Sequence, residues 1–295
     1  KGETLDEITG FAETMRSKSQ RVRADQEGLL DTCGTGGDGG RTFNISTAAA
    51  IVAAAGGVRV AKHGNRAMSS KSGSADVLEA LGVNIQLNAE QAEACLNRVG
   101  LCFMFAQLYH QSMKHAAGPR REIGFRTVFN LLGPLTNPAR ADRQLMGVYD
   151  RSRTELIALA MRELGVQQAL VVASHDGLDE ISLSAPTQIT ELKQGVISTF
   201  TVTPESLGLT PAALEDIAGG DAQENARIIR NIFAGERGAR RDVVLANAGA
   251  CFYVTGRSAS LQDGVRLAAD IIDSGKAEAK LQELIACTEE LAHVS

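Results

Sequence analysis

The sequence lacks any block of basic residues or basic tail, and its formal net charge at pH 7 is -5. Proteins that bind nucleic acid through its phosphates need clustered lysine and arginine, so that class is disfavoured. Long apolar runs are also lacking, since the longest, residues 48–55, is far short of the roughly 20 residues of a membrane-spanning helix. We therefore expect no nucleic-acid partner and no membrane partner.

Paired cysteines are absent as well. The five cysteines are scattered and form no CxxC pair, so neither a disulfide framework nor a zinc site is predicted. No signal peptide precedes the first helical pattern, and the cytoplasm is then the default location. The sequence starts with Lys1 rather than Met, and we expect a further N-terminal segment before it.

The sequence contains no low-complexity linker and no internal repeat. Its 295 residues suggest about two domains. With 44% hydrophobic and 22% charged residues, the composition is that of a soluble globular protein rather than a disordered one. A second domain would therefore be formed by insertion and not by a chain of separate units.

Glycine is what the chain has in excess. Of its 30 glycines, 11 lie within residues 28–82, a stretch of 55 residues. Glycine costs conformational entropy on folding, so it accumulates where the backbone needs unusual angles or must approach something closely. We expect the chemistry to be located in this stretch.

The pattern of elements around this stretch is that of an α/β fold. A short strand at Leu29 and Leu30 leads into a glycine loop, a helix follows over residues 48–55 with Asn44 or Ser46 as its cap, and the next strand covers residues 58–61. A strand, loop, helix and strand in this order form the βαβ unit of a parallel sheet.

The remaining elements are predicted from periodicity and turn residues. Helices are expected within residues 1–24, over residues 74–81, over much of 89–126, over 152–164 with a capping box at Ser152 and Glu155, from Asp221 to Gly235, and over most of the remainder; strands are expected at 83–85, 145–149 and 169–173, with a hairpin of 187–192 and 196–202.

The first motif is the loop GTGGD at residues 34–38, followed by NIST at residues 44–47. Glycines let backbone N–H groups converge, and the helix start adds free donors, which together suit a phosphate or diphosphate. The spacing fits neither the Walker motif nor GxGxxG. The alternative is that the glycines merely turn the chain.

The second motif is KHGNR at residues 62–66, directly after a strand, with SSKSGS at residues 69–74. Ligands bind at the carboxyl ends of strands in open α/β sheets, and these side chains suit a phosphorylated sugar. The alternative is a solvated basic loop, and His63 by itself would more often be structural.

Two further motifs carry charge. DGLDE at residues 176–180 follows a buried strand and suits Mg²⁺, which binds one or two carboxylates together with phosphate oxygens; the alternative is an acidic surface turn. Residues 115–121 (HAAGPRR) place arginine beside a Gly-Pro turn, where its planar fork can hold a carboxylate, although most arginines are simply solvated.

Taken together, GTGGDGGRTFNIST, KHGNRAMSSKSGSAD, MKHAAGPRREIGFRTVFNLLGPLTNP and DGLDEIS, in this order and spacing, resemble the anthranilate phosphoribosyltransferase family of tryptophan biosynthesis. The resemblance extends from Lys1 to the end of the chain. It implies a Mg²⁺-dependent glycosyltransferase that transfers a phosphoribosyl group from phosphoribosyl pyrophosphate to the amine of anthranilate. It also implies a small helical domain, a larger α/β domain with a central, mostly parallel sheet, and a homodimer.

The resemblance assigns site residues by position. Those for phosphoribosyl pyrophosphate are Gly34, Gly37, Asp38, Thr42, Asn44, Ile45, Ser46, Thr47, Lys62, His63, Gly64, Asn65, Arg66, Ala67, Met68, Ser69, Ser70 and Ser74. Those for anthranilate are Gly34, Asn65 and Arg120, and His63 would lie near the acceptor as a helper; the magnesium ligands would be Ser46, Asp179 and Glu180.

The resemblance also implies domain boundaries and a departure. Residues 1–24 and 89–126 would form the helical domain, and residues 25–88 and 127–295 the α/β domain. The family has about three more helices before the point that matches Lys1, and they belong to the dimer-forming domain. We therefore expect the dimer to depend on a segment that this chain lacks.

The chemistry is compatible with the absence of a catalytic triad. A diphosphate leaving group needs charge neutralisation, and a neutral aromatic amine needs positioning more than a strong base. The alternative enzyme is a pyrimidine nucleoside phosphorylase, which shares the overall plan but needs no metal; Asp179, Glu180 and the KHGN motif argue against it. A non-catalytic relative that binds nucleic acid or protein is a third hypothesis, which the acidic charge disfavours.

Overall fold

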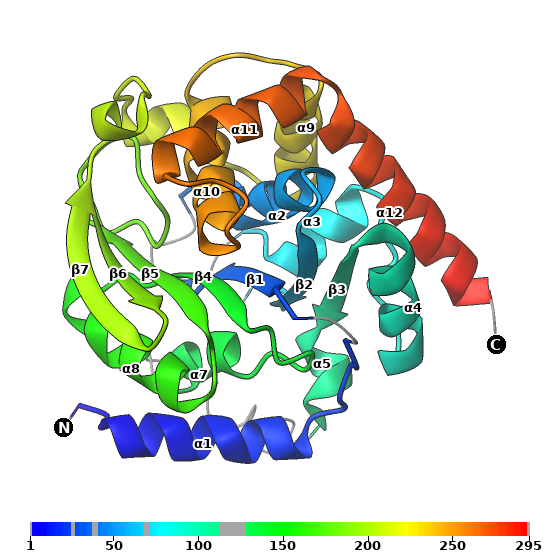
Figure 1. The fold of residues 1–295 in the computed structure, drawn as a ribbon. Coiled ribbons are helices and arrows are strands. Elements are labelled where there is room, and N and C mark those ends of the chain that lie inside the picture. The colour runs from blue at the N-terminus through cyan, green and yellow to red at the C-terminus, as the bar shows by residue number, and fades with distance from the viewer. Residues whose placement is uncertain (1, 25–26, 37–40, 68–70, 112–127, 294–295) are drawn as a thin grey trace.

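A seven-stranded sheet forms the centre of the molecule in the computed structural model, which describes residues 2–24, 27–36, 41–67, 71–111 and 128–293 (Figure 1). The strands are β1 (Leu29–Gly34), β2 (Arg59–Gly64), β3 (Leu101–Phe105), β4 (Arg143–Gly147), β5 (Gln168–Ser174), β6 (Thr187–Lys193) and β7 (Val196–Val202). Their order in the sheet is β3-β2-β1-β4-β5-β6-β7.

The first five strands of the chain are parallel, and the hairpin of β6 and β7 adds two antiparallel strands at one side. The predicted α/β fold with a mostly parallel sheet is confirmed, as are the predicted hairpin and the buried strand around residues 169–173. From β1 the chain first builds outward through β2 and β3, and then returns to the other side of β1 with β4. The topological switch point, where ligands bind in such sheets, therefore lies between β1 and β4.

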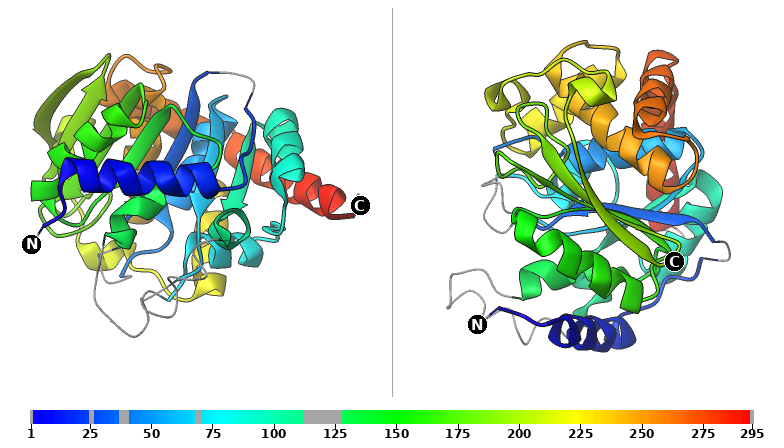
Figure 2. Two further views of the ribbon diagram at one scale, coloured as in Figure 1. Left: turned by 90° about the horizontal axis from the view of Figure 1, so that it is seen from below. Right: turned by 60° about the vertical axis from the view of Figure 1, so that its left-hand side comes forward.

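Helices cover both faces of the sheet, as Figures 1 and 2 show. One face carries α2 (Ile45–Ala55), α3 (Ser74–Ala80), α9 (Ala222–Phe233), α10 (Ala239–Val254), α11 (Leu261–Asp273) and α12 (Lys276–His293). The opposite face carries α1 (Leu5–Lys18), α7 (Phe129–Leu135) and α8 (Thr154–Glu163). α4 (Ala89–Val99) packs on β3 and α12, and the short α5 (Ala106–Tyr109) follows β3.

Each face has its own hydrophobic core. Ile51, Leu170 and Phe252 are among the buried side chains of the larger core, and Ile8, Leu132 and Ile157 among those of the smaller one. Burial of each such side chain stabilises the fold by roughly 1.5–3 kcal/mol. The sheet edge that carries the loops is thus fixed by packing on both sides.

Local signals explain where several helices begin. Thr4 and Glu7 form a capping box at the start of α1, which satisfies N–H groups that the first turn leaves free. The predicted cap at Asp221 is confirmed, because its Oδ1 accepts a hydrogen bond from Glu224 N at 2.9 Å. None of the helices in the described ranges combines the length and apolar character needed to cross a membrane.

Two element predictions were wrong. Residues 83–85 form no strand; Asn84 N donates instead to Thr288 Oγ1 of α12 at 3.1 Å, so this extended segment packs on a helix and has no strand partner. Ser152 does not cap a helix, because Asp150 accepts its N–H and a 3₁₀ turn (Arg151–Arg153) precedes α8. Strand β3 (Leu101–Phe105) lies within residues 89–126, a range that was predicted to belong to the helical domain. The predicted domain boundaries themselves stay a prediction.

Candidate active site

Three of the predicted motifs meet at the carboxyl edge of the parallel strands. β1 ends at Gly34, β2 ends at Gly64, and residues 176–180 follow β5. Parallel strands present their carboxyl ends on one edge, so the motifs come together although they are far apart in the sequence. The predicted residues Gly37, Asp38, Met68, Ser69, Ser70 and Arg120 lie outside the described residues.

Asp179 lies directly against the ends of β1 and β4. Its Oδ2 accepts a hydrogen bond from Gly36 N at 2.8 Å. A Cβ on Gly34 would lie 2.3 Å from Asp179 Oδ2, and a Cβ on Gly147 would lie 1.5 Å from the Asp179 carbonyl oxygen. Both positions therefore need glycine because a backbone or carboxylate from another loop occupies the space of a side chain.

Gly147 was not among the predicted site residues. Its signal was the position alone, a glycine within the strand predicted over residues 145–149, on the edge where ligands bind. In the sheet it pairs with Gly34 on one side and Val172 on the other, and its carbonyl accepts Thr35 N at 2.9 Å. Gly147 thus connects the glycine loop to the turn that carries Asp179.

Hydrogen bonds to the Asp176 side chain stabilise the turn over residues 176–180. The Asp176 carboxylate accepts hydrogen bonds from Leu178 N at 3.0 Å, from Ser182 Oγ at 2.6 Å and from Ser184 Oγ. Burial acts to raise the pKa of Asp176, but hydrogen bonds from the hydroxyls of Ser182, Ser184 and Ser174 and from Leu178 N together outweigh it, and the pKa is lowered. Asp176 therefore stabilises the turn as an ionised acceptor.

Asn247 of α10 fixes the following residue. Its Oδ1 accepts Ile181 N at 3.0 Å and its Nδ2 donates to Ile181 O at 3.0 Å, and it is fully buried. Because α10 packs against α2 and the sheet, this pair of bonds anchors the turn to a rigid element. Asp179 and Glu180 are thereby held nearly buried, with 6% and 9% exposure.

These two carboxylates fit a magnesium ion. Among the described residues no group of three or more His, Cys, Asp or Glu side chains is arranged to hold a metal. Mg²⁺ needs no such group, since it keeps several waters and takes one or two carboxylates with substrate phosphates. A pair of oxygen donors, held at a strand edge beside a glycine loop, is the kind of set it prefers.

Lys62 connects β2 to the start of α2. Its side chain is buried, and Nζ donates to Thr32 O at 2.5 Å and to Ser46 Oγ at 3.2 Å. The nearby hydroxyls of Thr35 and Thr47 are buried and have no hydrogen-bond partner among the described residues. A cation and free hydroxyl donors at a helix start provide what a phosphate group needs.

Asn44 connects the loop before α3 to the same helix start. Its Nδ2 donates to Ser72 O at 3.1 Å, and its Oδ1 accepts Asn225 Nδ2 of α9 at 3.0 Å. Of its predicted neighbours, Ile45 lies in the core and Thr42 forms an isolated bridge with Ala218. Asn44 therefore positions backbone, and its amide is already engaged by the protein.

The end of β2 packs tightly on α3. A Cβ on Gly64 would lie 2.1 Å from Ser74 Oγ, and Asn65 O accepts Ala75 N at 3.2 Å. Arg66 forms ion pairs with Asp76 at 2.9 Å and with Glu79, and lies 5.4 Å from the Phe105 ring centroid. The guanidinium of Arg66 is thus engaged by protein carboxylates, whereas Lys62 faces the helix start.

His63 and His110 form a buried pair beside Lys62, with ring centroids 5.0 Å apart. Burial, followed by the proximity of His110, lowers the pKa of His63 to about 3, and burial also lowers the pKa of His110. Neither Nε2 has a hydrogen-bond partner in the described part of the chain. Both imidazoles are neutral at pH 7, and His110 was not predicted because only the fold brings residue 110 to β2.

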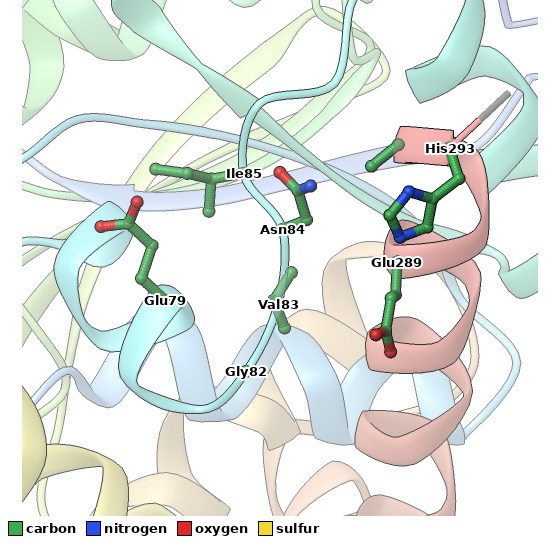
Figure 3. Close-up of a pocket in the computed structure, with 8 residues that line it drawn as sticks. Glu79, Gly82, Val83, Asn84, Ile85, Glu289 and His293 are labelled. Atoms are coloured by element: carbon green, nitrogen blue, oxygen red, sulfur yellow. The ribbon is translucent and has the colours of Figure 1, made fainter. Parts of the chain in front are cut away.

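A surface hollow of about 440 Å³ lies away from these motifs, between the segment after α3 and the last turns of α12 (Figure 3). It is lined by Glu79, Gly82, Val83, Asn84, Ile85, Glu289, Ala292 and His293. A second hollow, of about 450 Å³, is lined by residues after β4 and β5, including Tyr149 and His175. Neither contains a predicted site residue.

Known protein families and curated proteins match this chain over most of its length. Residues 26–278 match the model of the glycosyl transferase family, a/b domain. The chain is 56% identical to anthranilate phosphoribosyltransferase of Brevibacillus brevis over 96% of this chain and 83% of that protein. It is 52% identical to the enzyme of the same name from Acetivibrio thermocellus over 98% of this chain and 84% of that protein.

Solved structures of anthranilate phosphoribosyltransferases have the same fold over nearly the whole chain. The anthranilate phosphoribosyltransferase of Thermus thermophilus matches with a TM-score of 0.93 and 44% identity, over 98% of this chain and 86% of that chain. The enzyme from Saccharomyces cerevisiae in complex with phosphoribosyl pyrophosphate and Mg matches with a TM-score of 0.89 and 29% identity, over 97% and 81%. The yeast enzyme with 4-fluoroanthranilate matches with a TM-score of 0.89 and 28% identity, over 97% and 80%.

Proposed function

The chain belongs to the anthranilate phosphoribosyltransferase family, and from this premise we infer that it transfers the phosphoribosyl group of phosphoribosyl pyrophosphate to the amine of anthranilate. The products are pyrophosphate and N-(5-phosphoribosyl)anthranilate, in the pathway to tryptophan. In the reaction the C1–O bond to the diphosphate breaks, a C1–N bond forms, and the amine proton leaves to solvent.

One observation of the fold supports this function above the others. The glycine loop, the KHGN end of β2 and the Asp179 turn meet at one sheet edge, joined by the Gly36–Asp179 hydrogen bond and the Lys62–Ser46 hydrogen bond. A site of this kind offers donors to a diphosphate at C1 and carboxylates for a metal, without a nucleophilic side chain. Stabilising a leaving anion and holding two substrates in line is sufficient for this transfer.

We propose that the reaction uses Mg²⁺, held by Asp179, Glu180 and Ser46. When bound, the ion would neutralise charge on the diphosphate as a Lewis acid. The chain's own contribution is to hold the two carboxylates at the end of β5 through Asn247 and Asp176, and to keep Lys62 beside Ser46. The yeast structure named for phosphoribosyl pyrophosphate and Mg supports this proposal.

The proposed substrate contacts follow the predicted sets. Phosphoribosyl pyrophosphate would be held by the backbone and side chains of Gly34, Gly37, Asp38, Thr42 and residues 44–47, by residues 62–70, and by Ser74. Anthranilate would be held by Gly34, Asn65 and Arg120, with the Arg120 guanidinium on its carboxylate. Asn65 lies at the end of β2, next to the neutral His63, which suits an uncharged aromatic ring nearby.

We further propose a homodimer for the full-length protein and a cytoplasmic location. The helical domain would comprise residues 1–24 and 89–126, and residues 25–88 and 127–295 the α/β domain. Sedimentation velocity of the full-length protein over a range of concentrations tests the dimer. A monomer at every concentration would contradict the proposed dimer.

Substrate and metal dependence test the function itself. We expect turnover with phosphoribosyl pyrophosphate and anthranilate that vanishes on addition of EDTA and returns with excess Mg²⁺. Thymidine with inorganic phosphate is the comparison substrate, because a nucleoside phosphorylase would cleave it without metal. Metal-free phosphorolysis of thymidine at full rate, with no consumption of anthranilate, would refute the proposed function.

A further inference from the structure

The backbone pairing between β1 and β2 stops before these strands reach the edge of the sheet where the site lies. β1 pairs with β4 over five residue pairs, and β2 pairs with β3 over five. Between β1 and β2 the pairing covers only Leu29 with Arg59 and Leu30 with Val60, although both strands continue for four more residues. Backbone groups facing this gap need other partners, because unpaired buried N–H and C=O groups are costly.

Three buried side chains supply those partners. Asp31 Oδ1 accepts His63 N at 3.2 Å, Lys62 Nζ donates to Thr32 O, and Asn137 Nδ2 donates to Ala61 O at 2.8 Å. Asp31 is fully buried, and Lys62 and Asn137 are 3% exposed. We name Asp31, Lys62 and Asn137 the polar wedge, since they fill the gap where a continuous ladder would otherwise run.

Asn137 is the member that comes from outside the two strands. It follows α7, and its own Oδ1 accepts Ala139 N at 2.8 Å, which fixes the amide orientation. The Asn137 amide and the Lys62 ammonium both lower the pKa of Asp31, against the burial that raises it to about 6. Asp31 therefore lies beside both of the other members of the wedge.

The wedge adjoins the KHGN end of β2, since Lys62 is the first residue of KHGN and Asp31 accepts the N–H of His63. From the placement of these three side chains we propose that Asp31 and Asn137 are positioning residues for the transfer, which hold the end of β2 away from β1 and so align residues 62–65 with the glycine loop. This inference rests on the proposed function for its catalytic consequence. A continuous β1–β2 ladder would draw these two loops together and close the space between them.

The expected effect falls on turnover more than on binding. A displacement of about 1 Å in a reacting geometry can lower the rate about 100-fold. Phosphoribosyl pyrophosphate would still be held by the glycine loop, the α2 start and the Asp179 turn, because the two replaced side chains, Asp31 and Asn137, hydrogen-bond instead to His63 N, Ala61 O and Ala139 N. We therefore expect a lower kcat with a nearly unchanged dissociation constant for this substrate.

The test uses Asn137→Ala and Asp31→Asn, with Thr190→Val as the control. Thr190 is also a buried polar residue with side-chain hydrogen bonds, to Thr154 and Thr199, but it lies on β6 away from the site. Turnover, the dissociation constant of Mg-phosphoribosyl pyrophosphate measured without anthranilate, and the unfolding midpoint are recorded for each. The inference predicts at least a tenfold fall in kcat with less than a threefold change in the dissociation constant for both wedge variants, and neither change in the control.

A readout independent of activity separates the wedge from the proposed function. Hydrogen exchange of a peptide covering residues 60–66 should be at least tenfold faster in Asn137→Ala than in the parent or in Thr190→Val. If exchange and kcat of the wedge variants match those of Thr190→Val, the inference is overturned even though the parent enzyme is active. An inactive parent with faster exchange in the wedge variant would instead refute the function and retain the structural role. Asp31→Asn, which keeps the size of the side chain but removes its charge and replaces one acceptor oxygen by an NH2 donor, keeps the test valid if Asn137→Ala does not fold.

Discussion

The contact between Gly147 and Asp179 gives a sharp prediction for Gly147→Ala. The added Cβ would lie 1.5 Å from the Asp179 carbonyl oxygen and 2.4 Å from its carbonyl carbon. Ordinary contact begins at 3.4 Å, so along that direction the separation must increase by about 1.9 Å (3.4 less 1.5). Gly147 is paired on both sides, with Gly34 and Val172, and so the Asp179 turn has to move.

The displacement would carry the proposed metal ligands with it. Asp179 and Glu180 are adjacent, and a shift of more than 1 Å takes both away from the glycine loop and breaks the Gly36 N–Asp179 Oδ2 bond of 2.8 Å. A misplacement of about 1 Å costs on the order of 100-fold in rate, which corresponds to about 2.7 kcal/mol in the barrier. We expect kcat to fall about 100-fold and the Mg²⁺ concentration for half-maximal activity to rise at least tenfold.

The assay is turnover against Mg²⁺ concentration, with the unfolding midpoint measured in parallel. Gly10→Ala is the matched control, because its Cβ would meet no atom within 4 Å and alanine favours a helix by about 0.5–1 kcal/mol. Gly34→Ala is a milder variant, since its Cβ would meet the Asp179 carboxylate at 2.3 Å and that group can rotate. A folded Gly147→Ala protein with the parent's kcat and Mg²⁺ dependence would refute the reasoning.

Three further predictions concern single groups. Arg120→Ala should raise the KM for anthranilate tenfold or more, from loss of a charge-assisted bond of ~1.5–3 kcal/mol, and an unchanged KM would remove Arg120 from the acceptor site. Replacing Asp179 and Glu180 together with alanine should abolish Mg²⁺-dependent turnover in initial-rate assays; retained activity would mean that the metal is held elsewhere. Burial raises the pKa of Asp31 from 3.8 to about 6, so the stability linked to its protonated form is present below pH 3.8 and lost as pH rises through about 6. Urea unfolding should therefore show Asp31→Asn gaining about 2 kcal/mol relative to the parent between pH 4 and pH 7, and a pH-independent difference would contradict this.

Local patterns predicted those elements whose cause is local. The cap at Asp221, the buried strand at residues 169–173 and the hairpin around Gly195 each follow from residues within a few positions of one another, and the structure has them. Residues 83–85 have the apolar character of a strand, but no described strand pairs with them; Val83 N donates to Leu78 O of α3, and Asn84 N donates to Thr288 Oγ1 of α12. The residue pattern of a strand predicts that a segment is extended, but it does not predict which element of the fold the segment will pair with.

The site was predictable to the extent that its motifs are contiguous. The glycine loop, KHGN and DGLDE are each readable in the sequence, and α/β topology brings their positions to one edge. Gly147, His110 and Asn137 were missed because their roles depend on contacts across long sequence separations, such as the 76 positions between Asn137 and Ala61. The role of a single asparagine or glycine cannot be predicted from its neighbours in the sequence, because it depends on which distant residues the fold brings into contact with it.

The central claim is tested most directly by following the fluorescence of anthranilate with this chain, phosphoribosyl pyrophosphate and Mg²⁺. Transfer consumes the free amine, so the account predicts loss of anthranilate fluorescence, one pyrophosphate released for each anthranilate consumed, and no reaction when phosphoribosyl pyrophosphate or Mg²⁺ is omitted. Unchanged fluorescence with a folded chain and both substrates present would contradict it.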